Sequence, residues 1–344
     1  MPSEIFITSN IAGKIRQYLE GKQYSGICII VDENTEEHCL PLLLPSLPGA
    51  NIIAIKSGEE NKNLATCEHI WQKMTDLQLD RKALVINVGG GVIGDMGGFC
   101  AATYKRGIDF IQVPTTLLSQ VDASVGGKLG VDFQHFKNHI GVFCEPVAVF
   151  IDTVFLKTLP VNELRSGYAE VIKHCLIADS EKWEEISLKS FEEQNWNDLV
   201  KHSIQMKAKI TSEDPFEGGL RKILNFGHTI GHAIESYFLN IPGKKLLHGE
   251  AIAIGMIAEA FIAHDKGFIS ENDLNKIKSY ILSVFGHREL FEYDLEKIIT
   301  LTLQDKKNER NAILCSLLEE PGKANYNQPV QFREIRDALK FYSL

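Results

Sequence analysis

The stretch ALVINVGGGVIGDMGGF, residues 83–99, runs from an apolar, β-branched segment directly into a cluster of glycines. The apolar segment is typical of a buried strand, and we expect a helix after the glycines. Gly89, Gly91 and Gly94 satisfy the pattern GxGxxG, in which backbone without side chains can approach a pyrophosphate at a helix N-terminus. The pattern alone leaves two interpretations open, a nucleotide site and a structural loop.

The position of this glycine cluster differs from that of a classical dinucleotide fingerprint. In the classical case the glycines follow the first strand, whereas here they follow the third candidate strand, and Asp95 stands where the fingerprint has no fixed acid. The acidic residue that holds a ribose must then come from another strand. Asp32, at the end of the segment ICIIVD, lies where the carboxyl end of a strand would present it.

The residues before Pro160 alternate short, β-branched runs with segments of helical periodicity. The predicted strands are 27–31, 51–55, 83–88, 109–113 and 147–151. Residues 62–79 have the apolar spacing of a helix. Strand, helix and strand in repetition predict an α/β domain with a mostly parallel, Rossmann-like sheet.

After Pro160 the strand-like runs nearly vanish and helical segments follow one another. The predicted helices are 161–178, 196–211, 219–238, 249–266 and 270–284. We therefore expect two domains, an α/β domain at 1–157 and an all-α domain at 158–344. No flexible Gly/Ser linker separates them, and two tightly joined domains form an interdomain cleft, which is the usual place for an active site.

The composition is that of an ordinary globular protein, with 44% hydrophobic and 24% charged residues. The net charge of -9 and the lack of a polybasic run argue against nucleic-acid binding. The N-terminus lacks the apolar region of a signal peptide, and the longest apolar stretch, 251–263, contains Glu259 and is too short to span a bilayer. We expect a cytoplasmic protein without membrane contacts, whose seven cysteines, an odd number without a CxxC pair, are reduced core thiols.

The stretch NFGHTIGHAIE, residues 225–235, suggests a metal site. His228 and His232 stand four residues apart, on one face of a predicted helix. The pattern is similar to the zinc motif HExxH, but Thr229 takes the place of the glutamate. Other ligands must therefore be sought elsewhere in the chain.

Two further residues are candidate ligands. His248 opens the next predicted helix, and Glu170 lies in an apolar helical segment where a buried carboxylate needs a partner. Three ligands of His/Glu type with an open fourth position describe a catalytic zinc, and with His228 and His232 four candidates compete. For each one taken singly, the alternative is a hydrogen-bonded helix histidine, or Glu170 paired with Lys173 at i+3.

Seven basic residues, each taken singly, have a solvated surface as the default interpretation, and they are Arg106, Lys128, Lys137, Lys207, Arg221, Lys306 and Lys307. Several of them stand beside glycine or inside apolar helical segments, where a free charge is harder to explain. A small polyanionic substrate would account for them. A solvated surface would account for most of them as well.

Over nearly its whole length the chain resembles the 3-dehydroquinate synthase family. The resemblance rests on long blocks in the family's order, which are SGEENKN (57–63), GGGVIGD (89–95), VPTTLLSQVDASVGGKLGVD (113–132), KNHIG (137–141), SGYAEVIKH (166–174), LRKILNFGHTIGHAIE (220–235), LHGEA (247–251) and DKK (305–307). The segment between His232 and His248 is a few residues longer than is typical, and 309–324 departs from the family pattern. Other sugar-phosphate cyclases and the glycerol dehydrogenases share the family's fold.

The resemblance implies a divalent zinc or cobalt ion and a tightly held NAD. The implied metal ligands are Glu170, His228 and His248, while His232 is implied to contact the substrate phosphate. The residues that match the family's NAD contacts are Asp32, Glu59, Lys62, Gly91, Val92, Asp95, Thr115 and Thr116.

The implied substrate is a phosphorylated keto acid, 3-deoxy-D-arabino-heptulosonate 7-phosphate. The family converts it to 3-dehydroquinate and phosphate by transient oxidation with NAD, β-elimination, re-reduction and intramolecular aldol closure, a lyase reaction of the shikimate pathway to chorismate and the aromatic amino acids. The residues that match substrate positions are Asp122, Lys128, Asn138, Lys173, Lys207, Arg221, Asn225, His232 and either Lys306 or Lys307. Arg106 matches an arginine that enters the neighbouring subunit's site, which implies a homodimer.

Two alternatives share this fold, NAD and a metal. Another sugar-phosphate cyclase would act on a substrate without the carboxylate. Such enzymes tend to change the residues that match Arg221, Asn225, His232 and the lysine of the DKK block, all of which are retained here. A polyol dehydrogenase of the glycerol dehydrogenase type would accumulate NADH instead of regenerating NAD. From a different class, a catalytically silent NAD-binding protein would not need the metal ligands.

Overall fold

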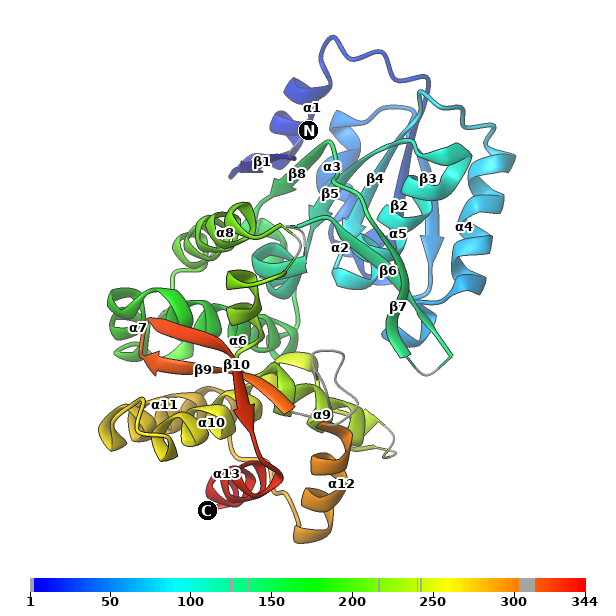
Figure 1. Ribbon diagram of the computed structural model, residues 1–344. Helices are drawn as coiled ribbons and strands as arrows, with labels where there is room; N and C mark the ends of the chain where they lie inside the picture. Colours follow the sequence, from blue (N-terminus) through cyan, green and yellow to red (C-terminus); the bar gives the residue numbers. More distant parts are fainter. Residues whose placement is uncertain are drawn as a thin grey trace. The chain divides into compact units, whose positions relative to one another are not determined.

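The computed structural model describes residues 3–123, 126–134, 136–215, 217–239, 241, 243–302 and 313–344. Contacts within the chain divide it into two compact units, Met1–Leu164 and Arg165–Leu344 (Figure 1). The division falls a few residues after the boundary at 157/158 that we expected from the sequence. Each unit is described by itself.

The first unit is built on a six-stranded sheet whose order is β1-β8-β5-β4-β2-β3. The strands are β1 (Glu4–Ile7), β2 (Ile27–Asp32), β3 (Asn51–Ile55), β4 (Leu84–Gly89), β5 (Asp109–Pro114) and β8 (Ala148–Ile151). Every pairing is parallel, as predicted. The five predicted strands are all present, and β1 is an additional edge strand whose four residues are too few to show a pattern.

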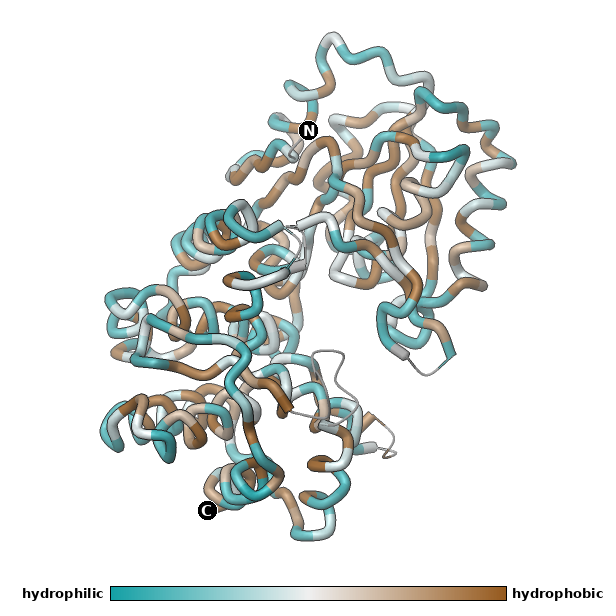
Figure 2. The backbone as a smooth tube through the Cα atoms, in the orientation of Figure 1, coloured by the Kyte–Doolittle hydropathy of each residue, from teal (hydrophilic) through white to brown (hydrophobic). Residues whose placement is uncertain are grey.

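Helices cover both faces of this sheet, which explains why its strands read as unbroken apolar runs. On one face lie α4 (Leu64–Asp76) and α5 (Gly91–Thr103), and on the other lie α1 (Ile11–Leu19) and α3 (Leu40–Leu43). All six residues of β4 are buried. Figure 2 shows the sheet as a hydrophobic layer, with more hydrophilic residues along α4. The helix predicted at 62–79 is α4, which is a few residues shorter than the prediction.

An antiparallel hairpin, which the sequence analysis did not predict, follows the sheet's fifth strand in the chain. It consists of β6 (Lys128–Phe133) and β7 (Phe136–Phe143), with Lys128 opposite Phe143. The glycines at 130 and 141 face each other across the hairpin, where a Cβ on Gly141 would lie 2.3 Å from the Leu129 carbonyl oxygen. Polar residues and glycines interrupt the apolar alternation on which strand prediction depends.

The second unit is rich in helices, as predicted. Its helices are α6 (Val161–Ala178), α7 (Ser180–Ser187), α8 (Trp196–Glu213), α9 (His228–Leu239), α10 (His248–Asp265), α11 (Glu271–Phe285), α12 (Glu292–Thr302) and α13 (Phe332–Ser343), of which α6 begins just inside the first unit. The predicted helix 219–238 is interrupted at Gly227, whose φ of +79° is left-handed. Its first part is a 3₁₀ segment, Leu220–Asn225, and its second part is α9.

The prediction that this unit is entirely α-helical is wrong. Strands β9 (Ile313–Glu320) and β10 (Lys323–Val330) form an antiparallel hairpin that packs against α10. The turn between them contains Gly322, whose φ is +92°. Pro-Gly after an alternating run is a hairpin signal that we did not use, because the helical texture of the neighbouring segments dominated the prediction.

Two other expectations concern the whole chain. Its seven cysteines are all free thiols, and all but the half-buried Cys144 are buried, as predicted. Among the helices of the described residues, none combines the length and apolar character needed to cross a membrane.

Candidate functional site

The glycine cluster lies at the point where the order of the parallel strands reverses. From β2 the chain adds β3 on one side, and it then returns to add β4 on the other side of β2. Ligands of open α/β sheets bind outside the carboxyl ends of the strands at such a switch point. Asp32 ends β2 and Gly89 ends β4, so the predicted acid and the glycines lie on neighbouring strands at this edge.

The glycines play different parts from those that the fingerprint assigns. A Cβ at Gly94 would meet only ordinary contacts, the nearest being 3.5 Å from Gln112 Oε1. A Cβ at Gly97 would lie 2.1 Å from Asn87 Oδ1, so Gly97 is the residue that lets α5 pack closely on β4. At the start of α5 the N-cap residue Gly90 provides no side-chain cap, and the first backbone N–H groups are left for other acceptors.

The other predicted NAD contacts have polar partners within the first unit. Lys62 is buried, and its Nζ lies 2.6 Å from Asp95 Oδ2 and 2.6 Å from Asn138 Oδ1. Burial lowers the pKa of Lys62, but Asp95 and Glu59 outweigh it and raise the pKa above its usual value. Asp32 caps helix α2 (Glu33–His38).

The remaining NAD candidates are placed by the ends of the sheet strands. Val92 is the second residue of α5. Thr115 and Thr116 directly follow β5, which is the neighbour of β4. Glu59 begins a short 3₁₀ segment, Glu59–Asn61. The structure therefore brings Asp32, the start of α5 and the two threonines to one edge of the sheet.

In the second unit the four candidate metal ligands lie together. Glu170 Oε1 lies 3.4 Å from His228 Nε2 and 3.6 Å from His248 Nε2. Two atoms bound to one tetrahedral zinc, each about 2.1 Å from the ion, lie about 3.4 Å apart. Ligand atoms of His228, His232 and His248 also lie within 4.8 Å of one another. The spacing is that of a metal site, and by itself it leaves His232 as a fourth possible ligand.

In both His228 and His248, which begin α9 and α10, the ring nitrogen Nδ1 has a polar partner. His228 Nδ1 lies 3.1 Å from the Phe226 carbonyl oxygen, and His248 Nδ1 lies 3.2 Å from Glu235 Oε2. Metal-binding histidines commonly donate their other N–H to a carbonyl or carboxylate, which leaves Nε2 for the ion. Sequence reasoning missed Glu235, although its spacing three residues after His232 indicates the same helix face.

The start of α10 lies directly against the backbone of α6, which carries Glu170. A Cβ at Gly249 would lie 1.9 Å from the Ser166 carbonyl oxygen. The Gly249 N–H donates to the hydroxyl of Ser166 at 2.9 Å. Because only glycine permits this approach, residue 249 brings His248 next to Glu170.

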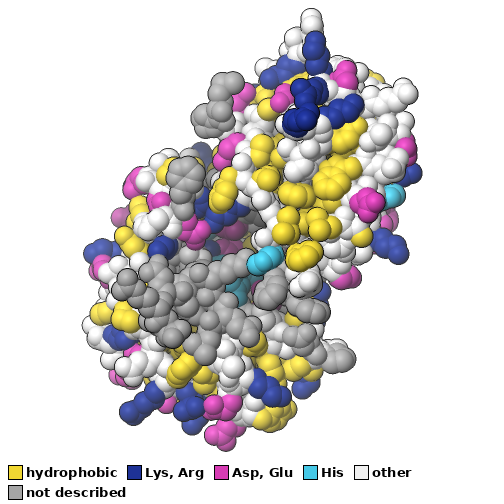
Figure 3. Space-filling model, turned by 45° about the vertical axis from the view of Figure 1, so that its right-hand side comes forward, with side chains coloured by type: hydrophobic (Ala, Val, Ile, Leu, Met, Phe, Trp, Pro, Cys, Tyr) yellow, Lys and Arg dark blue, Asp and Glu magenta, His cyan; other side chains and the backbone are white. Residues whose placement is uncertain are grey.

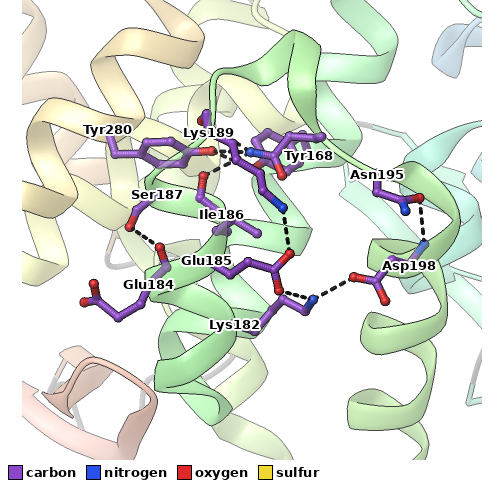
Figure 4. A network of polar contacts seen from close by, with 11 residues as sticks. Tyr168, Lys182, Glu184, Glu185, Ile186, Ser187, Lys189, Asn195, Asp198 and Tyr280 are labelled. Atoms are coloured by element: carbon purple, nitrogen blue, oxygen red, sulfur yellow. Dashed lines mark hydrogen bonds and ion pairs between the residues drawn. The ribbon is translucent and has the colours of Figure 1, made fainter.

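A buried polar network holds α6 on its other side (Figure 4). The hydroxyls of Tyr168 and Tyr280 lie 2.6 Å apart, and the Gln194 side chain donates to the Tyr280 hydroxyl at 3.1 Å and to the Ile186 carbonyl at 3.0 Å. Tyr168 is fully buried and precedes Glu170 by two residues. The network therefore stabilises the position of the helix from which Glu170 projects.

Charged side chains lie close together in this cluster. Glu170 forms an ion pair with Lys173, the partner that we considered as the alternative to a metal, and both side chains are buried. Burial lowers the pKa of His248, but the neighbouring carboxylates of Glu170 and Glu235 outweigh it and raise the pKa to about 9. Without a metal ion, His248 therefore carries a proton at neutral pH.

The basic residues fall into two groups. Lys173, Lys207 and Arg221 are buried in the second unit, with 1%, 5% and 4% exposure, so the interpretation as a solvated surface is wrong for Lys207 and Arg221. Arg106, Lys128 and Lys137 are exposed. Lys306 and Lys307 lie outside the described residues.

Arg221 and Asn225 are held by the segment that leads into the 3₁₀ turn. The carboxylate of Asp214 accepts hydrogen bonds from the backbone of Gly219 at 2.7 Å and Arg221 at 3.0 Å. The Asn225 amide donates to Glu217 Oε1 at 2.9 Å. Neither Asp214 nor Glu217 was among the predicted site residues, and no spacing rule singles them out.

The fold defines a class of structures that includes a cyclase and a dehydrogenase. A structure of 2-deoxy-scyllo-inosose synthase, complexed with carbaglucose-6-phosphate, NAD⁺ and Co²⁺, matches with a TM-score of 0.86 and 27% identity, covering 98% of this chain and 96% of that one. A glycerol dehydrogenase from Schizosaccharomyces pombe shares the fold, with a TM-score of 0.70, 16% identity and coverage of 99% and 89%.

Sequence comparison gives the family within this class. The family models for the N-terminal and C-terminal parts of 3-dehydroquinate synthase match residues 52–166 and 167–308. A 3-dehydroquinate synthase from Parabacteroides distasonis is 39% identical over 345 residues, which cover 98% of this chain and 97% of the relative. The chain belongs to the 3-dehydroquinate synthase family.

Proposed function

We propose that this chain converts 3-deoxy-D-arabino-heptulosonate 7-phosphate to 3-dehydroquinate and phosphate, using NAD and a divalent metal ion. The observation that carries the proposal is the convergence of Glu170, His228 and His248, from three helices, at the spacing of atoms that share one ion. Membership of the family supports the reaction, and the match with a relative over 98% of this chain supports it for both units.

The donor set fits zinc or cobalt. One carboxylate and two imidazoles leave an open coordination position, as in catalytic zinc sites, and Nδ1 of both imidazoles is already engaged. Bound there, the ion would act as a Lewis acid on substrate hydroxyls, and NAD would accept a hydride and return it. We assign His232 to the substrate phosphate, following the family resemblance.

The buried cations of the second unit would bind the anionic groups of the substrate. Lys173, Lys207 and Arg221 are desolvated, so a carboxylate or phosphate that meets them interacts more strongly than it would at a solvated surface. Arg221 already donates to the Pro215 carbonyl at 2.8 Å, which orients its guanidinium. Such fixed cations would hold a flexible substrate in one orientation through successive steps.

The remaining substrate positions are proposed from the resemblance. They are Asp122, Lys128, Asn138, Asn225 and either Lys306 or Lys307. Of these, Asn138 accepts a hydrogen bond from Lys62 in the structure and has a φ of +49°, a strained conformation that is common at functional sites.

We place NAD at the switch point between β2 and β4. The backbone N–H groups at the start of α5, which has no side-chain cap, would bind its pyrophosphate. Asp32 would accept a hydrogen bond from a ribose hydroxyl. The same location holds phosphate-bearing nucleotides in other open α/β sheets. Its proposed contacts include Val92, in the first turn of α5, and Thr115 and Thr116, which follow the strand next to β4.

We also propose a cytoplasmic homodimer in which Arg106 reaches the neighbouring subunit's site. Lys105, Arg106 and Gly107 all have left-handed φ values, of +50°, +70° and +108°, and Arg106 is exposed, so the turn presents its side chain at a cost in strain. The β6–β7 hairpin exposes Phe143, at 69%, and Figure 3 shows hydrophobic side chains gathered on one face of the first unit. The reduced thiols fit a cytoplasmic location.

A substrate panel tests the proposed reaction. With the heptulosonate phosphate, the enzyme should release phosphate without a net change in NADH absorbance, because the cofactor is regenerated. Turnover of sedoheptulose 7-phosphate in place of the heptulosonate would indicate another sugar-phosphate cyclase. Accumulation of NADH with glycerol or a similar polyol would indicate a dehydrogenase, and NAD binding without any turnover would indicate a silent protein.

A further inference from the structure

Glu259 is a carboxylate that lies inside α10 with 0% exposure. An ionised carboxylate taken out of water is strongly unfavourable unless hydrogen bonds replace its hydration. Here the Gly227 N–H donates to Oε2 at 2.7 Å and the Ile230 N–H donates to Oε1 at 3.1 Å. Both donors belong to the beginning of α9, so the carboxylate binds the start of a neighbouring helix.

The beginning of α9 needs such an acceptor from elsewhere. The first N–H groups of a helix have no partner within it, and a Ser, Thr, Asp or Asn side chain at the N-cap usually accepts from one of them. Gly227 precedes the first residue of α9 and has no side chain. A Cβ at this position would lie 2.5 Å from Met256 Cγ, and the φ of +79° also favours glycine. A capping side chain therefore cannot stand at 227, and Glu259 takes over its role.

The two helices are close enough for this contact because glycines line their interface. A Cβ at Gly255 would lie 2.0 Å from the Gly227 carbonyl oxygen, and one at Gly231 would lie 2.8 Å from Ile252 Cδ1. Glu259 stands one turn after Gly255 on the same helix face, and this places its carboxylate at the start of α9. The positive end of the α9 dipole also favours a negative charge there.

We propose that Glu259 is a positioning residue for the metal centre. His228 is the first residue of α9 and stands between the two residues whose N–H groups Glu259 binds. Its Nε2 must remain 3.4 Å from Glu170 Oε1 if both are to bind one ion. By holding the first turn of α9, Glu259 keeps His228 in place before the metal arrives, and this preorganisation strengthens metal binding.

Helix α10 begins with His248 and carries Glu259 three turns later. One element thus supplies one proposed ligand and fixes the backbone of another. This inference rests on the proposed function, because it takes His228 and His248 as metal ligands. It adds a residue that acts on His228 through the backbone of α9.

The test compares Glu259→Gln and Glu259→Ala with a matched variant, Asp294→Asn. Asp294 is a similarly buried carboxylate, with 3% exposure, and it caps α12 by accepting from the Phe291 N–H at 2.9 Å. It contacts Tyr237, in the part of α9 remote from His228. The affinity of each purified protein for Zn²⁺ is measured by competition with a chromophoric chelator, and the Co²⁺ forms are compared by their visible absorption.

For Glu259→Ala we expect zinc affinity about 10–100-fold below that of the unmodified chain, the range for loss of a group that orients a metal ligand. Glu259→Gln should show a smaller loss, because its carbonyl oxygen can still accept one of the two N–H groups. Both should change the Co²⁺ absorption, which reports ligand geometry. Asp294→Asn should unfold at a lower temperature but bind zinc and cobalt like the unmodified chain.

The inference would be overturned if both Glu259 variants had the zinc affinity and the Co²⁺ absorption of the unsubstituted chain. An equal loss in Asp294→Asn would overturn it as well, because the effect would then be one of general stability. If Glu259→Ala does not fold, the comparison of Glu259→Gln with Asp294→Asn decides. Failure of the proposed function has a different signature, which is an unmodified chain that binds no metal or a His248→Ala variant that binds it unchanged.

Discussion

Replacing Gly249 with alanine, which adds a single methyl group, should strongly weaken metal binding. The added Cβ would lie 1.9 Å from the Ser166 carbonyl oxygen, 2.5 Å from its carbonyl carbon and 2.6 Å from its Cα. All three are backbone atoms, so no change of rotamer can relieve the overlap. The start of α10 must move away from α6 by about 1 Å or more to restore van der Waals contact.

This displacement acts directly on His248, which precedes the substituted residue. The distance between its Nε2 and Glu170 Oε1 is 3.6 Å, whereas metal sites tolerate deviations of only about 0.2 Å in their bond lengths. We therefore expect zinc affinity to fall by at least about 10–100-fold, the loss seen even for groups that only orient a ligand. Overpacking should also lower the free energy of unfolding by about 1–3 kcal/mol.

The assay measures bound zinc per chain, together with thermal unfolding and NAD binding. The matched control is Gly26→Ala in the first unit, where the nearest atom to a new Cβ, Leu79 Cδ2, is 3.8 Å away. This control should keep its metal. A Gly249→Ala protein that is folded and binds one zinc per chain with unmodified affinity would show that the contact of α10 with Ser166 does not position His248.

Three further predictions follow from the site. His248→Ala should remove metal and activity together but leave NAD binding intact; an active variant with normal metal content would contradict the assigned ligand set. Arg106→Ala should raise the KM for the phosphorylated substrate and leave metal content unchanged, and unaltered kinetics would argue against its role across a dimer. The metal-free protein should release a proton when it binds zinc at pH 7, because the pKa of His248 is raised to about 9 and its proton is still bound there. Calorimetry in buffers of different ionisation enthalpy should show this release decreasing as the pH rises through about 9, and a release that does not decrease would contradict the raised pKa.

The metal centre shows where reasoning from sequence stops. The spacing of His228 and His232 indicated one helix face, and it is only in the folded chain that Glu170 and His248 approach the same point. Glu170 and His228 are separated by the second half of α6, all of α7 and α8, and two 3₁₀ segments. No local period relates residues so far apart, so the sequence left four candidates for three places.

The supporting residues were harder still to foresee. Glu259 counted in the sequence only as a charge that interrupts an apolar stretch, and its function becomes visible through the N–H groups that it binds on α9. Gly97 and Gly249 look like ordinary helix glycines, yet each stands where a Cβ would overlap a neighbouring element. A close approach between two elements is a property of their packing and leaves no pattern in either one alone.

The sequence by itself determined the parallel sheet, most helices of the second unit and, through its motif blocks, the family. These depend on hydrophobic periodicity and turn residues, which act over a few neighbouring positions. Only the tertiary structure decided which strand ends meet at the switch point, that hairpins follow β5 and α12, and which carboxylates reach the metal ligands. Those features depend on distances between segments remote in the chain, which are settled when the apolar faces pack together.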